Sequence, residues 1–308
     1  MLRWLDDDGC TDVATAGGKG ASLALLTALG IPVPPGFVVP AGALCEALEA
    51  AGALAALRRL LADAGEESRR PAVAQEACAT VRAAPVPETL ADELREAYGR
   101  LGDGVPVAVR SSACGEDSET ASFAGPQETY LHVRGAGAVI EKVRACWCSF
   151  FTERALFYRA AKGSLEDLDI AVVVQRMVEP DVAGVMFTVD PARGRWDRIV
   201  VEAVFGLGES VVSGELTPDH YVLSRRGELK RSRLQTQPFA VVHDDGGGTR
   251  RVPLAPAAGE APTLDEAALR RLAALGVELE ERLGGPQDVE WAIRDGELFV
   301  LQARPVTA

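Results

Sequence analysis

The sequence contains no apolar stretch long enough to cross a bilayer, which requires about 20 consecutive apolar residues. Its first residues, MLRW followed by Asp6, Asp7 and Asp8, also lack the apolar region of a secretory signal peptide. Both absences argue against a membrane-spanning or secreted protein. We therefore expect a cytoplasmic protein.

An excess of positive charge is also missing. The chain has 32 lysine and arginine residues against 45 aspartate and glutamate residues, which gives a formal net charge of −13. Proteins bind nucleic acids and anionic membranes through clustered lysine and arginine, because this releases counterions. The composition therefore argues against nucleic acid or a membrane surface as a partner.

Cysteine is scarce, with six residues in 308, and their spacing matches no disulfide framework. We expect reduced thiols that are mostly buried. Cys146 and Cys148 lie two positions apart in a predicted helix, where their side chains point in different directions. They are therefore not expected to form a metal-binding pair.

The length of 308 residues exceeds the size at which a single hydrophobic core stops growing, about 250 to 300 residues. We predict an α+β fold with two lobes and no internal repeat. The first lobe, residues 1–168, contains a glycine-rich turn, a helical stretch over 41–101, a strand with a flap, and a helix over 139–162. The second lobe, residues 169–308, contains a buried strand near 170, a loop over 244–261, an amphipathic helix over 264–283 and a terminal hairpin.

The terminal hairpin alternates between apolar and polar residues with a period of two. The odd positions Val289, Trp291, Ile293, Phe299 and Leu301 are apolar, and the even positions include Asp288, Glu290, Gln302 and Arg304. A two-residue Asp295-Gly296 turn would set Glu290 opposite Leu301 and mix the two faces. A three-residue loop over 294–296, with Gly296 in the left-handed conformation, sets Asp288 opposite Gln302, so we predict this loop.

This register places two carboxylates, an amide and a guanidinium on one surface. The oxygen atoms suit Mg²⁺, and the planar cation suits phosphate. Taken alone, the segment fits equally well an amphipathic edge hairpin with solvated charges.

A glycine-rich turn lies near the other end of the chain, at Gly17, Gly18, Lys19 and Gly20, followed by a helical pattern. Glycines let backbone amides approach a phosphate, the helix N-terminus favours an anion, and Lys19 adds a positive charge. The spacing differs from that of a Walker A loop. On its own, such a segment is commonly only a turn.

A third polar segment follows a short apolar strand that ends at Arg110. The loop over 116–125 is rich in acidic, hydroxylated and glycine residues, and a second strand follows over 128–133. Such a loop suits a mobile flap that closes over phosphates and excludes water. A plain surface hairpin is the other interpretation.

Together these segments resemble the nucleotide-binding domain of the phosphoenolpyruvate synthase and pyruvate phosphate dikinase family, which includes rifampin phosphotransferase and has an ATP-grasp fold. The resemblance spans essentially the whole chain. The matching segments, in order, are 17–23, 108–112 with Glu116 and Asp117, 121–125, 172–178, 183–191, Glu202, 206–209, 212–214, 217–219 and the terminal hairpin.

The resemblance implies a Mg·ATP site between the two lobes. Lys19, Arg110 and Arg304 would contact the phosphates. Glu290 and Gln302 would hold Mg²⁺, with Asp288 in support. The remaining implied nucleotide contacts are Gln175, Met177 and Val178 at the adenine, Thr188 near the phosphates, Glu202 in the ribose and phosphate wall, and Gly125 in the flap.

The resemblance also implies a reaction in which ATP is cleaved to AMP and orthophosphate and its β-phosphoryl group passes to a histidine. The three histidines of the chain, His132, His220 and His243, do not lie in the acceptor motif. We therefore expect the acceptor histidine on a swivelling domain or a separate protein, and the sequence does not identify the final small-molecule acceptor.

Two positions depart from the family pattern, at Ala113-Cys114-Gly115 and at Pro126-Gln127. Pro126 restricts the backbone beside Gly125, so the flap would close differently. Two alternatives to this reaction remain. One is an ATP-grasp ligase that forms an acyl phosphate and releases ADP, and the other is a nucleotide-binding module without catalytic activity.

Overall fold

The computed structural model describes residues 1–113, 128–212, 214–244 and 248–306. The predicted flap, including Gly125 and Pro126, lies outside the described residues. The chain forms two compact units. Unit 1 comprises Met1–Leu29 and Pro35–Met177, and unit 2 comprises Gly30–Pro34 and Val178–Ala308.

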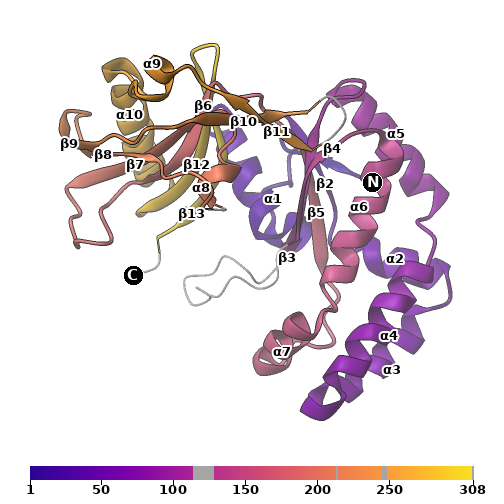
Figure 1. The fold of residues 1–308 in the computed structure, drawn as a ribbon. Coiled ribbons are helices and arrows are strands. Elements are labelled where there is room, and N and C mark those ends of the chain that lie inside the picture. The colour runs from indigo at the N-terminus through magenta and orange to yellow at the C-terminus, as the bar shows by residue number, and fades with distance from the viewer. Residues whose placement is uncertain (114–127, 213, 245–247, 307–308) are drawn as a thin grey trace. The chain divides into compact units, whose positions relative to one another are not determined.

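Unit 1 contains an antiparallel five-stranded sheet of order β1-β2-β5-β3-β4 (Figure 1). Its central strand is buried on both faces, because Val173 faces α1 while Val172 and Val174 join the core formed with the other helices. The strands are β1 (Arg3–Trp4), β2 (Gly36–Val39), β3 (Val107–Ala113), β4 (Thr129–Val133) and β5 (Ile170–Arg176).

The position of β5 differs from the predicted lobe boundary at residues 168 and 169. The sequence indicated a buried strand here, and we expected it to open the second lobe. Instead, β5 pairs with β2 on one side and with β3 on the other. Both edges are therefore satisfied within unit 1, and unit 2 resumes only at Val178.

The helical parts of unit 1 are more divided than the sequence indicated. The predicted stretch over 41–101 forms four α-helices and two short 3₁₀ turns, and the predicted helix over 139–162 is interrupted at residues 150–152. Thr152 ends the interruption by accepting a hydrogen bond from Ala155 N at 3.3 Å, which caps the next helix. The helices are α1 (Val13–Ala28), α2 (Ala43–Ala50), α3 (Leu54–Ala62), α4 (Arg70–Ala83), α5 (Glu88–Leu101), α6 (Ala136–Ser149) and α7 (Glu153–Lys162), with η1 (Asp63–Gly65) and η2 (Glu67–Arg69) before α4.

Unit 2 contains an antiparallel six-stranded sheet of order β13-β12-β6-β7-β8-β9. The short segment Gly30–Pro34 joins this unit through a 2.8 Å hydrogen bond from Val300 N to Pro32 O. The strands are β6 (Val182–Phe187), β7 (Arg198–Phe205), β8 (Asp219–Ser224), β9 (Leu229–Arg233), β12 (Gln287–Arg294) and β13 (Glu297–Pro305), and the short helix α8 (Glu209–Val212) follows β7.

The helix α10 (Glu266–Leu283) covers one face of this sheet, close to the predicted range of 264–283 (Figure 1). Asp265 caps its start by accepting a hydrogen bond from Ala268 N at 2.7 Å. Gly276 allows close packing, because a Cβ atom there would lie 3.2 Å from the Met186 sulfur. Among the described helices, none is long and apolar enough to cross a membrane.

The predicted loop over 244–261 is wrong for about half of its length. β10 (Phe239–His243) and β11 (Thr249–Pro253) pair as a hairpin, and the short helix α9 (Pro256–Gly259) follows. At the end of this hairpin, Asp244 N donates to Gly248 O at 3.0 Å. The β-branched residues Thr249 and Val252 favour the extended strand that the proline and alanine content concealed.

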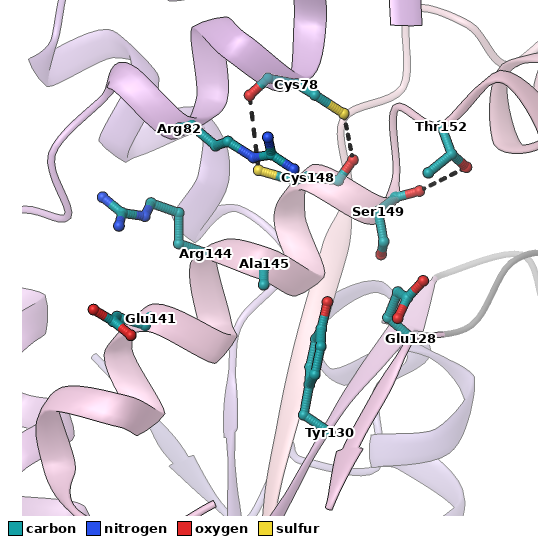
Figure 2. Close-up of a pocket in the computed structure, with 10 residues that line it drawn as sticks. All are labelled: Cys78, Arg82, Glu128, Tyr130, Glu141, Arg144, Ala145, Cys148, Ser149 and Thr152. Carbon is teal, nitrogen blue, oxygen red and sulfur yellow. Dashed lines mark hydrogen bonds between the residues drawn. The ribbon is translucent and has the colours of Figure 1, made fainter. Parts of the chain in front are cut away.

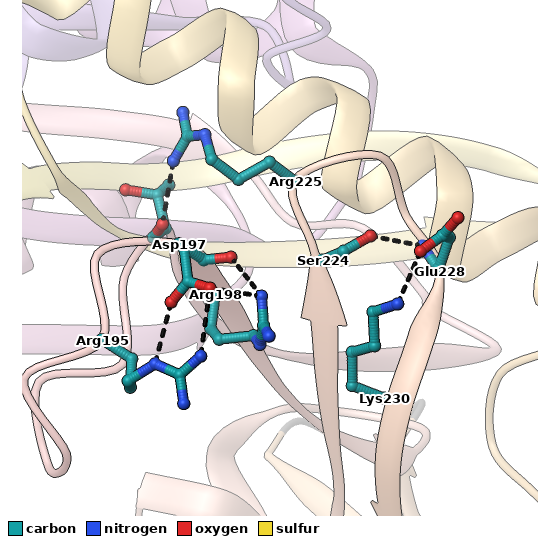
Figure 3. A network of polar contacts seen from close by, with 8 residues as sticks. Arg195, Asp197, Arg198, Ser224, Arg225, Glu228 and Lys230 are labelled. Atoms are coloured by element: carbon teal, nitrogen blue, oxygen red, sulfur yellow. Dashed lines mark hydrogen bonds and ion pairs between the residues drawn. The ribbon is translucent and has the colours of Figure 1, made fainter.

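Polar contacts order the connection that leads into β7 and the turn between β8 and β9 (Figure 3). Asp197 accepts from Arg195 Nε at 2.9 Å and pairs with Arg198 at 2.6 Å. The hydrogen bond from Arg195 lowers the pKa of Asp197. Arg225, just after β8, reaches Glu280 of α10 at 2.5 Å, so it fixes the turn against the helix.

A buried carboxylate joins β8 to two loops of unit 2. Asp219 is fully buried, and its oxygens accept four hydrogen bonds. The donors are Gln235 N at 2.7 Å and, at 3.0 Å each, the Tyr221 hydroxyl, Thr263 N and Thr263 Oγ1. The motif residue Asp219 is therefore a structural anchor, because buried polar groups are stable only when they are hydrogen-bonded.

Candidate functional site

The glycine-rich turn is a break inside α1. Gly17 has φ 66° and ψ 174°, so a second helical segment begins directly after it. A Cβ atom at Gly17 would lie 2.1 Å from Ser112 O, and only glycine fits. Ser112 Oγ donates to Ala16 O at 2.8 Å and accepts from Gly20 N at 3.2 Å. The turn is thus fixed against β3, and the amides that follow Gly17 form the first turn of a helix.

Lys19 lies beside the strand that carries Arg110. Its side chain is 5% exposed, and its Nζ donates to Ser111 O at 3.0 Å. Arg110 is the preceding residue of β3 and is partly buried. The structure therefore brings two predicted phosphate contacts to one region of unit 1, beside the amides at a helix N-terminus, where anions bind favourably.

The predicted adenine residues lie at the end of β5. Gln175 is 3% exposed and is paired with Gly36 on one side and Ala108 on the other. Met177 N donates to Pro106 O at 2.9 Å, and the Met177 sulfur accepts from His132 N at 3.1 Å. These contacts fix the chain where it leaves the sheet.

The peptide between Met177 and Val178 retains one donor and one acceptor. The Met177 amide already binds Pro106 O, and the Val178 carbonyl lies 3.2 Å from His243 Nε2. Among the described residues, the Met177 carbonyl and the Val178 amide have no hydrogen-bond partner. These two groups are therefore available for the adenine contact that the resemblance implies.

The terminal hairpin uses a different turn from the one predicted. Arg294 pairs with Glu297, so the turn is the two-residue Asp295-Gly296 turn, with φ values of 49° and 78°. Two positive φ values are typical of a type I′ turn. The predicted three-residue loop and the predicted opposition of Asp288 and Gln302 are therefore wrong.

A β-bulge places the predicted polar residues on one face of the hairpin, although the predicted loop is absent. The register shifts between Glu290 and Trp291, so that Leu301 is the extra residue of β13. Beyond the bulge, Glu290 lies opposite Gln302, and Asp288 lies opposite Arg304. The four predicted residues therefore share one face despite the shorter turn.

The bulge also changes which apolar residues enter the core. Trp291 and Val300 are fully buried on the face toward α10, and Ala303 is 5% exposed there. Phe299 and Leu301, which we expected in the core, are only partly buried. One extra residue reverses the alternation along the rest of the strand.

Asp288 and Arg304 form the best-defined contact of this face. Arg304 donates from Nε at 2.8 Å, and a terminal nitrogen lies at 2.7 Å, both from Oδ2 of Asp288. Asp288 is 13% exposed, whereas Arg304 is 54% exposed. The carboxylate therefore holds the inner part of a guanidinium that reaches toward solvent.

The donor set of the hairpin fits Mg²⁺. Within the described residues, no group of three histidine, cysteine or acidic side chains could hold a metal ion. Mg²⁺ usually takes one or two carboxylates and completes its shell with water and substrate phosphates. The Glu290 carboxylate, opposite the Gln302 amide and near Asp288, provides such a partial set.

Glu202 lies on the same face of the sheet, two strands away from Glu290. The register runs from Glu290 to Val185 of β6, then to Glu202 of β7 and to His220 of β8. Two strand spacings separate the acidic residues by roughly 10 Å. His220 Nδ1 lies 3.4 Å from Glu202 Oε1. The position of His220 between the core-facing residues Asp219 and Tyr221 was the sequence signal that its side chain lies on this face.

Thr188 has internal contacts that fix the end of β6. It is fully buried, its amide donates to Gln287 O at 2.9 Å, and its hydroxyl accepts from Gln287 N at 2.8 Å. A contact between Thr188 and a phosphate stays a prediction.

A pocket of about 280 Å³ lies elsewhere in unit 1, between α4, α6 and β4 (Figure 2). Cys78 Sγ lies 3.1 Å from Cys148 O, and Cys148 Sγ lies 3.8 Å from Cys78 O. Burial raises the pKa of both thiols, which keeps them protonated and unreactive near neutral pH. None of the predicted nucleotide residues lines it; the lining residues are Cys78, Arg82, Glu128, Tyr130, Glu141, Arg144, Ala145, Cys148, Ser149 and Thr152.

Comparison with known proteins agrees with the resemblance seen in the sequence. A probable phosphoenolpyruvate synthase from Archaeoglobus fulgidus is 43% identical over 314 residues, which cover 99% of this chain and 41% of that protein. A rifampicin phosphotransferase from Streptomyces sviceus is 40% identical over 304 residues, which cover 96% of this chain and 35% of that protein. The chain thus spans less than half the length of either relative.

A likeness to D-alanyl-alanine synthetase A from Vibrio cholerae, with a TM-score of 0.38 and 11% identity over 94% of this chain and 58% of that chain, is too weak to support an argument. The family model named "Pyruvate phosphate dikinase, AMP/ATP-binding domain" matches residues 13–308. The predicted resemblance is confirmed, and the chain belongs to the family of pyruvate phosphate dikinase AMP/ATP-binding domains.

Proposed function

We propose that this domain binds Mg·ATP, releases AMP and orthophosphate, and passes the β-phosphoryl group to a histidine on a separate domain or partner protein. The observation that carries the proposal is the hairpin face on which Glu290 lies opposite Gln302 and Asp288 holds Arg304. It occurs in a chain that matches an AMP/ATP-binding domain over residues 13–308.

Unit 1 would supply the groups for the phosphates and much of the adenine contact. Lys19, Arg110 and the amides after Gly17 neutralise charge that develops on the transferred phosphoryl group and the leaving groups. The Met177 carbonyl and the Val178 amide, which begins unit 2, read the purine edge. Gln175 supports that edge from inside the sheet.

Unit 2 would supply the metal-binding residues. Glu290 and Gln302 hold Mg²⁺, which when bound neutralises charge on the phosphate oxygens. Asp288 orients the Arg304 guanidinium toward the terminal phosphates, and Glu202 lies in the ribose and phosphate wall. Thr188 supports this wall indirectly, because its hydroxyl accepts a hydrogen bond from Gln287 N and fixes the backbone there.

We place the acceptor histidine outside this domain. His132 donates its amide to the Met177 sulfur, His220 contacts Glu202, and His243 contacts the Val178 carbonyl. Each of the three histidines therefore already has a contact within its own unit. The relatives are longer than this chain, and their names indicate different substrates, so we also assign the choice of the final small-molecule acceptor to other parts of the whole protein.

ATP labelled at the β-phosphate tests the proposal. With Mg²⁺ and the cognate histidine-bearing domain, we expect AMP as the nucleotide product and label on the histidine of that domain, as detected by mass mapping under alkaline conditions that preserve phosphohistidine. ADP as the main product, with a carboxylate as acceptor, would establish the ligase alternative. Label on His220 would show that this chain carries its own acceptor.

A further inference from the structure

We infer that His220 is a positioning residue that holds the Glu202 carboxylate in place on the nucleotide-binding face. The inference rests on the proposed function, since it concerns the same face of unit 2. It assigns a role to a histidine that is neither a phosphate acceptor nor part of the core.

The register of the sheet places His220 and Glu202 directly across from each other. They are paired residues of β8 and β7, and cross-strand pairs project to the same face. His220 Nδ1 lies 3.4 Å from Glu202 Oε1, and the side chains are 36% and 34% exposed. The contact is therefore partly shielded but open to a ligand.

The backbone of His220 is fixed by its two neighbours in the strand. Asp219 and Tyr221 project to the opposite, buried face, where they share hydrogen bonds with Thr263. Their side chains are 0% and 2% exposed. His220 thus extends from a rigid strand, which suits a residue that must orient another side chain.

Glu202 needs such support because its long side chain has several rotatable bonds. Val185, the only residue between Glu202 and Glu290 in the register, has no polar atom in its side chain. On the β8 side, the Glu202 carboxylate contacts the His220 ring. Without this ring the carboxylate would lose rotational restriction, and a ligand would have to supply the ordering free energy.

The experiment compares His220→Ala, His220→Asn and Glu202→Ala with the double variant. The asparagine amide nitrogen can occupy the place of Nδ1, so His220→Asn is the conservative variant. The measurements are the Kd of Mg·ATP, the Kd of adenosine, thermal unfolding, and KM and kcat with the histidine-bearing domain present.

We expect His220→Ala to weaken Mg·ATP binding by about tenfold, near the lower limit of the loss for a hydrogen bond to a charged group. KM should rise with little change in kcat, because a contact made equally in the ground and transition states is lost. His220→Asn should recover most of the affinity. In the Glu202→Ala background, His220→Ala should have no further effect.

Two results would overturn the inference while leaving the proposed function intact: unchanged Mg·ATP binding in His220→Ala, or equal losses with and without Glu202. A lowered unfolding temperature that His220→Asn does not correct, with equal loss of Mg·ATP and adenosine binding, would also replace positioning by a structural role. Failure of the wild-type domain to bind Mg·ATP would overturn both.

Discussion

Asp288 and Arg304 face each other across β12 and β13, and two nitrogens of the guanidinium meet the same carboxylate oxygen, at 2.8 and 2.7 Å. The Asp288 side chain is 13% exposed, whereas the Arg304 side chain is 54% exposed. Asp288 is therefore better suited to orienting Arg304 than to serving as a third metal ligand. This relationship separates two effects in the hairpin that substitutions can measure independently.

Removal of Asp288 should reduce turnover less than removal of Arg304. Arg304→Ala removes a preorganised donor, and such losses cost about 100-fold to 1,000-fold in rate. Asp288→Ala keeps the Arg304 charge but no longer orients the guanidinium, so we expect the rate to fall about tenfold. Steady-state kinetics with the histidine-bearing domain provide the measurement, and Arg294→Ala at the hairpin tip is the matched control. A larger loss for Asp288→Ala than for Arg304→Ala would contradict the orienting role.

Glu290→Ala and Gln302→Ala should both raise the Mg²⁺ concentration needed for ATP turnover, because each removes an oxygen donor from the metal set. Titration of Mg²⁺ at fixed ATP measures this, and Glu297→Ala, an exposed acidic residue of the same hairpin, is the control. Near-normal turnover of either variant at limiting Mg²⁺ would show that the metal is held elsewhere.

Gly17→Ala should disrupt the turn that positions Lys19. The new methyl group would lie 2.1 Å from Ser112 O, in addition to the strain of a positive φ. Gly9→Ala is the matched control, because Gly9 also has a positive φ, of 88°, but nothing lies within 4 Å of its Cβ position. The control should cost about 1 to 2 kcal/mol of stability, and Gly17→Ala more, in urea unfolding. Similar losses for the two variants would show that the contact with Ser112 is readily relieved.

Asp219→Ala should destabilise unit 2 by about 3 kcal/mol, because each buried donor left without an acceptor costs about 1 to 3 kcal/mol. Four hydrogen bonds end on this carboxylate. Asp265→Ala, which removes only a helix cap, should cost about 1 kcal/mol. Equal urea midpoints for the two variants would argue against the anchoring role of Asp219.

Stability should fall at alkaline pH through buried thiols. Burial is the main cause that raises the pKa of Cys146 from 9.0 to about 12 and that of Cys10 to about 11. The unfolded chain loses these protons above about pH 9 while the folded chain retains them, so the unfolded state is favoured increasingly from pH 9 to about 11 or 12. Urea unfolding across this range should show a shallower decline for Cys146→Ala than for the wild type. The same slope in both would exclude a contribution from this thiol.

The sequence was sufficient for features that depend on local pattern. The amphipathic helix α10 and the buried strand β5 follow from periodicity and apolar content, and the polar residues of the hairpin do share a face. The β-bulge at Leu301 could not be predicted, because the same alternation is compatible with a longer loop and no bulge. Only the tight packing of Trp291 and Val300 beneath α10 distinguishes the two.

The assignment of β5 to unit 1 likewise depends on pairing rather than on local sequence. An apolar run predicts a buried strand but does not name its neighbours. Gly36 allows β2 to approach β5 closely, since a Cβ atom there would lie 2.7 Å from Val174 O. This contact spans more than a hundred residues of sequence, beyond the reach of any local pattern.

The bulge at Leu301 divides the hairpin into two segments with separate registers. In the segment next to the turn, the pairs run from Arg294 with Glu297 to Trp291 with Val300. In the segment beyond the bulge, Glu290 pairs with Gln302 and the register is shifted by one residue. A protein engineer could therefore lengthen or shorten the tip without turning the functional side chains over. Regular pairing with Leu301 retained would instead set Leu301 opposite Glu290 and carry Gln302 and Arg304 to the core face, so the bulge determines whether the hairpin presents a binding surface.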